Sequence, residues 1–384
     1  MLDLSLCARA QYVNIDRIRL SIDNGPYDAV IALAPENVPY FGGFYNMDLR
    51  LLPERMHIVV WPKGGDPTFI AVQRRAENMP GSGGTFVKDM RGYKGEGLDS
   101  MRVLEEVLRD RGLTEGRLGF EGRWFPGAHL VDIKRRLPKA DFVDAYAFLE
   151  SIRVIKSEAE IAVLTRAANI TCDAIDSAFK AARPGNSERE ISARIQYEML
   201  RNGIEMVTAP LLASGDRSGY WHGMALDRPV ELGKVLKVDI GGTIDGYYSD
   251  IARTAVMGKA TPWQRDVHAK LTEVKHRIVD AIKPGVTAGE VAKIGEQTYD
   301  RLGLEFKWFI LGHNIGLGLH EEPSLYPWVT ESFKPGMTLM IEVGYNDDYP
   351  KESFHVEDLI LVEPGGARYL TDATRHERIW ELGV

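Results

Sequence analysis

The feature that most constrains this fold is an internal repeat in the second part of the chain. Residues 182–205 (ARPGNSEREISARIQYEMLRNGIE) match residues 282–305 (IKPGVTAGEVAKIGEQTYDRLGLE) at an offset of 100 positions. Each copy predicts a Pro-Gly turn, an amphipathic helix and a glycine at the helix end. Downstream, GKVLKVDIGG (233–242) aligns with GMTLMIEVGY (336–345) at an offset of 103. Two matching blocks in the same order favour duplication over coincidence.

The repeated strands each carry one carboxylate in an otherwise apolar run. Asp239 and Glu342 occupy equivalent places, so a pseudo-twofold axis could bring them face to face. The sequence after Asp239 predicts a hairpin, because Asp245-Gly246 is a turn signal between two β-rich segments. That hairpin would return Asp250 towards Asp239. Taken alone, either aspartate is better explained as a salt-bridged or turn-capping residue.

A second pair of carboxylates changes this interpretation. Glu342 lies in MTLMIEVGY and Glu357 lies in FHVEDLILV, both apolar strands. Four inward carboxylates cannot all ionise together without a cation, because like charges at close range repel strongly. His313 and His320, within LGHNIGLGLHEEPS, offer imidazoles, although a lone histidine is more often a hydrogen-bonded core or surface residue. Carboxylates with an imidazole suit manganese, iron, cobalt or zinc.

The remainder of the chain indicates two domains, with a boundary between residues 153 and 154. Residues 1–153 alternate strand-like segments (27–35, 56–62, 68–72, 117–122) with helical ones (11–23, 98–112, 127–137), which predicts an α/β domain with a mixed sheet. Residues 154–384 begin with a helix whose N-cap is Ser157. This second domain contains the repeat and every candidate catalytic residue.

Composition narrows the functional class. A formal net charge of -8 gives no electrostatic footprint for nucleic acid. No apolar run is long enough to predict a membrane span, and the first twenty residues lack the features of a signal peptide. The two cysteines fit no metal-thiolate pattern. We therefore expect a cytoplasmic protein that binds neither nucleic acid nor membrane.

The local strings around the candidate residues resemble the pita-bread metallopeptidases, which include Xaa-Pro dipeptidases (prolidases), aminopeptidase P, methionine aminopeptidase and creatinases. The resemblance rests on SGDRSGYWHG, VDIGGTIDGYYSDIARTAV, GHNIGLGLHEEP, PGMTLMIEVG and HVEDLILVE, and extends to NVPYFGGF (37–44) and IRVIKSEAEI (152–161). It covers most of the chain. It implies an N-terminal α/β domain (1–153) followed by an α+β pita-bread domain (154–384) with an internal pseudo-twofold repeat.

The resemblance also implies a dinuclear metal centre. Asp239 would chelate one divalent ion, His313 and Glu342 would bind the other, and Asp250 and Glu357 would bridge the two. Manganese is the first expectation for both ions, with cobalt, zinc or iron as alternatives. Creatinases lack several of these ligands, so the complete set argues against creatinase chemistry.

Three residues would have catalytic roles by the same resemblance. His222 and His320 would contact the substrate carbonyl and the developing oxyanion rather than metal. Glu342 could also shuttle a proton to the leaving nitrogen. With two metals to activate water and polarise the carbonyl, the expected enzyme is a hydrolase that cleaves the bond before proline in a small peptide or amide substrate.

The sequence departs from the family pattern at Trp221, where proline often precedes the histidine, and at two positions where arginine is expected. Prolidase-like enzymes usually carry arginine two residues before the last glutamate, and often another after the HExP string, but this chain has His355 and Ser324 there. Arginine is the natural fork for a substrate carboxylate, so we expect a weak or atypical prolidase. Arg217 is the nearest candidate replacement in sequence, although an exposed loop residue is the better explanation for it.

The sequence leaves two alternative functions open, and it also leads to an expected oligomeric state. The chain could instead be a metal-dependent hydrolase or lyase of a small non-peptide metabolite on the same fold. It could also be a catalytically inactive binding module, which the complete ligand set disfavours. We further expect a homodimer, in which the aromatic segment 40–45 (YFGGFY) of one chain borders the active site of the other, unless this segment only packs its own core.

Overall fold

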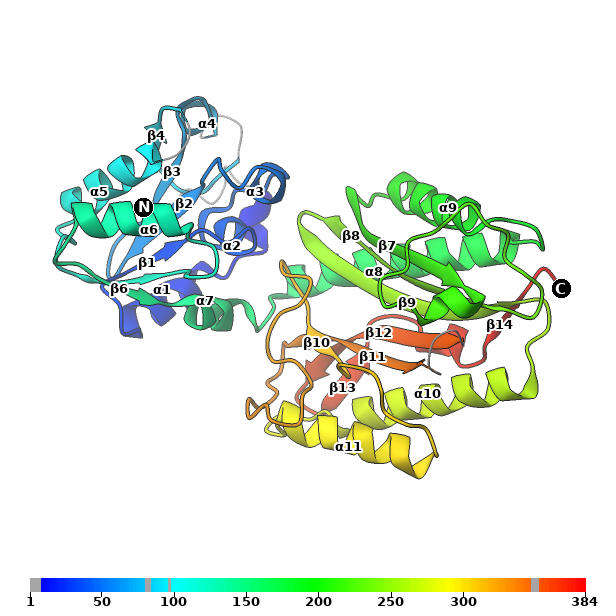
Figure 1. Cartoon of the computed structure of the whole chain (residues 1–384). Helices are drawn as coiled ribbons and strands as arrows, with labels where there is room; N and C mark the ends of the chain where they lie inside the picture. The colour runs from blue at the N-terminus through cyan, green and yellow to red at the C-terminus, as the bar shows by residue number, and fades with distance from the viewer. Residues whose placement is uncertain (1–7, 80–83, 96–97, 347–351) are drawn as a thin grey trace. The chain divides into compact units, whose positions relative to one another are not determined.

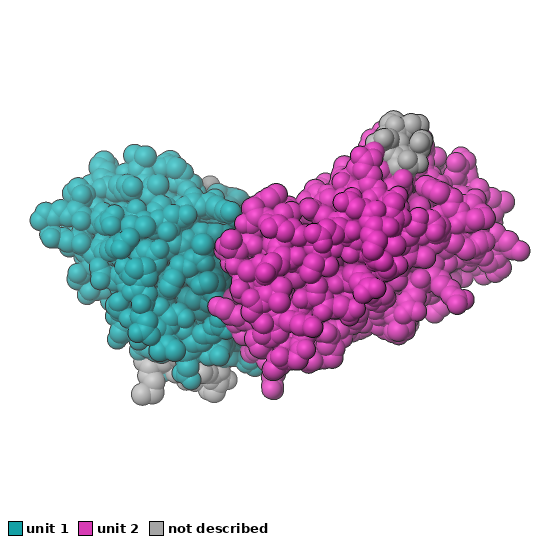
Figure 2. Space-filling model, turned by 90° about the horizontal axis from the view of Figure 1, so that it is seen from below, with its two compact units in different colours: residues 1–153 teal, residues 154–384 magenta. Residues whose placement is uncertain are grey.

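The computed structural model describes residues 8–79, 84–95, 98–346 and 352–384 of the chain. The chain divides into two compact units, Met1–Arg153 and Val154–Val384, which Figure 2 colours separately. The candidate site residues all belong to the second unit. Within the described residues, no helix is long and apolar enough to cross a membrane.

The first unit is built on a mixed six-stranded sheet with the order β4-β3-β2-β1-β5-β6. Its strands are β1 (Ala29–Ala32), β2 (Ile58–Pro62), β3 (Thr68–Val72), β4 (Asp89–Tyr93), β5 (Arg117–Phe120) and β6 (Asp141–Asp144). Its helices are α1 (Ile15–Asn24), α2 (Asn37–Gly42), α3 (Asp48–Leu51), α4 (Gln73–Asn78), α5 (Asp99–Asp110), α6 (Gly127–Arg136) and α7 (Tyr146–Arg153). The predicted α/β domain with a mixed sheet is therefore confirmed, and β4 and β6 are edge strands that the pattern missed.

The aromatic segment 40–45 belongs to the core of the first unit. Tyr40 and Phe41 are fully buried, and Phe44 is almost so. Phe41 packs edge-on against Trp61, and Phe44 stacks on His57. These three rings stabilise their own unit, which is the simpler of the two explanations for the segment.

The second unit has two sheets with helices on their outer faces (Figure 1). One sheet has the order β14-β9-β8-β7, and the other has the order β10-β11-β12-β13. The strands are β7 (Met206–Ser214), β8 (Val235–Ile244), β9 (Tyr247–Met257), β10 (His313–Asn314), β11 (Thr338–Asn346), β12 (Ser353–Glu363), β13 (Gly366–Tyr369) and β14 (Trp380–Leu382). Helices α8 (Glu158–Ala181) and α9 (Glu188–Arg201) cover the first sheet, and α10 (Pro262–Ala281) and α11 (Ala288–Arg301) cover the second.

Helix caps repeat between the two halves of this unit. Ser187 caps α9 and forms a capping box with Glu190, and Thr287 does the same for α11 with Glu290. These positions differ by the same 100 residues as the sequence repeat. The longer helices α8 and α10 also begin with capping boxes. Because each box satisfies backbone N–H groups that would otherwise lack partners, equivalent helices begin at equivalent places, and the predicted internal pseudo-twofold repeat is confirmed.

Candidate metal centre

The first hairpin brings two aspartates to the centre of the second unit. Strands β8 and β9 pair antiparallel, with Gly241 opposite Asp250 and Asp239 opposite Ala252. The turn that joins them is Asp245-Gly246, whose φ angles of 51° and 78° are left-handed, as this type of hairpin requires. The turn therefore fixes the register that returns Asp250 to the neighbourhood of Asp239.

The second hairpin places its two glutamates directly opposite one another. In the pairing of β11 with β12, Glu342 and Glu357 are partners. The chain beside Glu357 is held by a buried ion cluster, in which Asp358 pairs with both Arg253 and Lys275. Arg253 also donates to the carbonyl of Glu357. This cluster fixes the backbone of β12 against β9, and with it the position of the Glu357 carboxylate.

His313 supplies the imidazole between the two hairpins. It begins the short strand β10, directly after Gly312, which has a φ of 153° and where a Cβ would collide with the carbonyl of Met340. The Nδ1 atom of His313 lies 2.9 Å from the carbonyl of Asn314, so Nδ1–H donates and Nε2 keeps its lone pair. That buried Nε2 has no hydrogen-bond partner among the described residues. It lies 3.7 Å from Glu342, and 3.9 Å from both Asp250 and Glu357.

These five residues form two overlapping groups with the spacing of metal ligands. One group contains His313, Glu342 and Glu357, and the other contains Asp239, Asp250 and Glu357. In each group the ligand atoms lie within 4.8 Å of one another. The donor set of carboxylate oxygens and one unpartnered imidazole nitrogen fits a divalent first-row metal. The structure thus brings together all five residues that the sequence analysis singled out.

The electrostatics of this cluster favour a cation. Burial, reinforced by the neighbouring carboxylates Asp239 and Glu342, holds the pKa of Asp250 well above its usual range. Burial, together with Asp250 and Glu342, does the same for the pKa of Glu357. Burial also lowers the pKa of His313 to about 4, although Glu342 acts in the opposite direction. A bound cation would coordinate the neutral imidazole, and its charge would reduce the repulsion between the crowded carboxylates.

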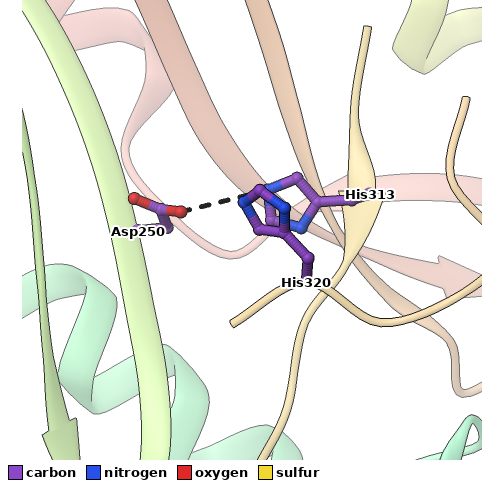
Figure 3. Close-up of side chains that lie close together, drawn as sticks. All are labelled: Asp250, His313 and His320. Atoms are coloured by element: carbon purple, nitrogen blue, oxygen red, sulfur yellow. Dashed lines mark ion pairs between the residues drawn. The ribbon is translucent and has the colours of Figure 1, made fainter. Parts of the chain in front are cut away.

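The two further histidines occupy different places. His320 is exposed, but its ring centroid lies 4.0 Å from that of His313, and it shares a ligand-sized group with Asp250 (Figure 3). His222 is exposed and belongs to none of these groups. Its neighbour Trp221 packs against Trp308 with 4.5 Å between ring centroids. Since the Nε1 of Trp308 donates to Glu342 at 3.4 Å, the segment that carries His222 borders the cluster.

The positions where arginine was expected have other roles. His355 is buried, with Nε2 3.3 Å from Glu342 and Nδ1 3.8 Å from Asp239. Ser324 is buried, and its backbone N–H donates to Glu322. Arg217 forms a largely buried ion pair with Glu188 and donates to the carbonyl of Met224. Its side chain is therefore engaged in holding the fold, unlike an exposed loop residue or a free substrate ligand.

Sequence reasoning missed two residues that border the cluster, Lys237 and Trp308. Lys237 is buried on β8, two residues before Asp239, and its ammonium lies 5.8 Å from the centroid of the Trp308 ring. Burial lowers the pKa of Lys237 to about 8, and Asp239 opposes this shift. A charged residue within the apolar run VLKVDI was a usable signal, but Trp308 comes from a distant segment without a recognisable motif.

Comparison with known proteins identifies the class. Residues 162–364 match metallopeptidase family M24, and residues 14–155 match the creatinase/prolidase N-terminal domain. The chain belongs to metallopeptidase family M24 and is a hydrolase with the pita-bread fold, as the sequence analysis predicted.

Individual relatives agree with this assignment. An Xaa-Pro dipeptidase of Pyrococcus furiosus is 33% identical over 276 residues, which cover 71% of this chain and 77% of that protein. The crystal structure of the prolidase from Pyrococcus horikoshii matches with a TM-score of 0.78 and 27% identity, over 92% of this chain and 96% of that one. An X-Pro aminopeptidase from Thermotoga maritima, at 23% identity, shares the fold with a TM-score of 0.83, over 96% of this chain and 100% of that one.

Proposed function

We propose that this chain is a metal-dependent Xaa-Pro dipeptidase whose centre holds two divalent ions. The observation that carries the proposal is the pair of overlapping ligand groups that share Glu357. One isolated group would suit a single ion, whereas two groups with a common carboxylate suit two neighbouring ions. The similarity to relatives named Xaa-Pro dipeptidase supports the choice of substrate.

The proposed ligands divide between the two sites. Asp239 belongs to one site, and His313 and Glu342 belong to the other. Asp250 and Glu357 serve both. The unpartnered Nε2 of His313 supports this assignment. So does the pKa of Asp250 and of Glu357, which burial, reinforced by the neighbouring carboxylates, raises well above the usual range. We further propose manganese, because an oxygen-rich set with one imidazole suits it.

The catalytic roles follow from burial and position. When bound, the ions would supply Lewis-acid activation of water and of the scissile carbonyl. Glu342 is buried at the junction of both hairpins, where its carboxylate can accept a proton and return it to the leaving nitrogen. His320 is exposed beside His313, so it can donate a hydrogen bond to the substrate carbonyl oxygen. His222 lies on the bordering segment 220–222 and would contact substrate from there.

Kinetics on defined peptides test this function. Purified protein, stripped with a chelator and reloaded with manganese, should hydrolyse an Xaa-Pro dipeptide and should not hydrolyse the matching Xaa-Ala dipeptide at a comparable rate. Cobalt, zinc and iron provide the comparison for metal preference. Equal rates on both dipeptides would overturn the proline specificity, and full activity in the stripped protein would overturn the metal dependence.

The cellular setting is part of the same proposal. We expect a homodimer in the cytoplasm that acts on small peptides. Light scattering at micromolar concentration should give twice the mass of the 384-residue chain. A monomer in that measurement would contradict the pairing without affecting the proposed chemistry.

A further inference from the structure

A buried ammonium group lies beside the metal centre without a carboxylate of its own. Lys237 is 5% exposed, and its Nζ donates to the carbonyl of Tyr220 at 3.2 Å. Its other contact is with the face of Trp308, 5.8 Å from the ring centroid. Among the residues that the structure describes, no carboxylate comes within ion-pair distance of this nitrogen. A buried charge without an ion-pair partner is costly, so its retention calls for a reason.

Packing alone does not supply that reason. In the repeat alignment, Lys237 of β8 corresponds to Met340 of β11, since GKVLKVD aligns with GMTLMIE. Met340 is fully buried in the same relation to Glu342 as Lys237 has to Asp239. The second half therefore shows that an uncharged side chain of similar length fits this place in the scaffold. Packing therefore does not require the charge of Lys237, and this charge is present only in the first half.

The surroundings of the ammonium connect it with substrate. Lys237 and Asp239 lie two residues apart on one strand, so their side chains leave the same face of the sheet. The Tyr220 carbonyl that accepts its hydrogen bond belongs to segment 220–222, which also carries His222. The Trp308 ring beneath it packs against His355, with 4.6 Å between ring centroids. The ammonium thus lies between the metal centre and the segment that would contact substrate.

The other three positions considered for binding the substrate carboxylate are Arg217, His355 and Ser324. Arg217 is paired with Glu188. His355 stands where arginine was expected on β12, but both its nitrogens face the carboxylates Asp239 and Glu342. Ser324 carries no charge. Where the resemblance led us to expect an arginine on β12, Lys237 offers a positive charge from β8, a strand of the other sheet.

We propose that Lys237 binds the C-terminal carboxylate of the dipeptide substrate and so sets the preference for free dipeptides. The inference rests on the proposed dipeptidase function and deepens it. Lys237 is a point charge rather than a fork, so it recognises a carboxylate by charge more than by geometry. In place of the weak carboxylate recognition expected from the missing arginines, the enzyme should prefer a dipeptide to its C-terminal amide.

The test compares Lys237→Met, which installs the residue of the other half, with wild type. The substrates are an Xaa-Pro dipeptide and its C-terminal amide. In the variant, KM for the dipeptide should rise roughly 10- to 100-fold, the range for losing a hydrogen bond to a charged group, while KM for the amide stays the same. Lys237→Arg should recover most of the preference. Lys234→Met, an exposed lysine three residues earlier, is the matched control and should behave as wild type.

Two readouts separate this proposal from the dipeptidase function itself. Elemental analysis should show equal metal content in Lys237→Met and wild type, which excludes damage to the centre. Calorimetry should show that wild type binds L-proline more tightly than L-prolinamide, and that the variant does not distinguish them. If no dipeptide is cleaved but this binding difference holds, the dipeptidase function fails and the role of Lys237 stands. If dipeptide and amide lose affinity equally, or if wild type distinguishes neither pair, the role of Lys237 is refuted.

Discussion

The two halves of the catalytic unit share a backbone plan and differ in chemistry. Each half has two capped helices packed on a sheet and a hairpin that carries two carboxylates. In the first hairpin the aspartates are offset by two positions, whereas in the second Glu342 directly faces Glu357. The second half alone contributes an imidazole to the five ligand residues, through His313. The repeat therefore fixes where side chains are presented, and individual substitutions decide what each half does there.

This comparison predicts unequal effects when one carboxylate is removed from each half. Glu357 belongs to both ligand groups and Asp239 to one. Glu357→Ala should lose both ions, while Asp239→Ala should retain about one ion per chain, measured by elemental analysis. Losing Lewis-acid stabilisation worth several kcal/mol should lower the rate of Glu357→Ala by about a thousandfold or more.

The turn of the first hairpin offers a matched control. Asp245→Asn removes a carboxylate from the same hairpin outside the cluster, and asparagine tolerates the left-handed backbone there. This variant should keep both its metal and its rate. If Glu357→Ala retains two ions, Glu357 is not a ligand that the two ions share.

The next largest effect separates two neighbouring histidines of the second half. His320→Ala should retain metal and lose roughly 100- to 1000-fold in kcat, as when an oxyanion donor is removed. His313→Ala should lose metal, because its Nε2 is buried among the carboxylates. If His320→Ala loses its metal instead, the exposed imidazole is a ligand and its proposed role is wrong.

Most of the metal ligands and the first hairpin could be predicted from the sequence, because the signals that mark them are local. Carboxylates inside apolar strands marked four of the five ligand positions, and Asp245-Gly246 marked the hairpin. Edge strand β4, DMRGY, was missed because it carries two charges and a glycine, and so lacks the apolar pattern of a strand. The contact of Trp308 with Lys237 joins segments 71 positions apart, a contact that only the folded chain creates.

A further difference between the halves should appear as pH sensitivity. His268 of α10 is buried at the place where α8 has Leu164, counting from the capping residues Thr261 and Ser157. Burial, with smaller contributions from Lys275, His376 and Arg253, lowers the pKa of His268 from 6.5 to about 3. Because the pKa of His268 is lower in the folded state than in the unfolded state, its neutral form contributes its full stabilisation above pH 6.5. That stabilisation is lost as the pH falls below 6.5.

Urea unfolding of the metal-free protein measures this effect. Between pH 7 and pH 5, wild type should lose about 2 kcal/mol through His268 alone, in addition to losses that other groups cause. His268→Leu gives α10 the residue of α8. Over the same pH interval its unfolding free energy should fall by about 2 kcal/mol less than that of wild type. Equal pH dependence in the two proteins would show that His268 is not held neutral in the folded state.

The smallest predicted difference concerns the helix caps, where the halves are most alike. Ser187 and Thr287 each accept a hydrogen bond from the backbone N–H three residues later, at 3.2 Å in both cases. Replacing either with alanine should cost about 1 kcal/mol in unfolding free energy. Ser187 is buried and Thr287 is partly exposed, and an unmade hydrogen bond costs more where water cannot replace it. Urea unfolding should therefore give the larger loss for Ser187→Ala. The opposite order would mean that the two caps, despite their shared geometry, are supported differently by the sheets on which they pack.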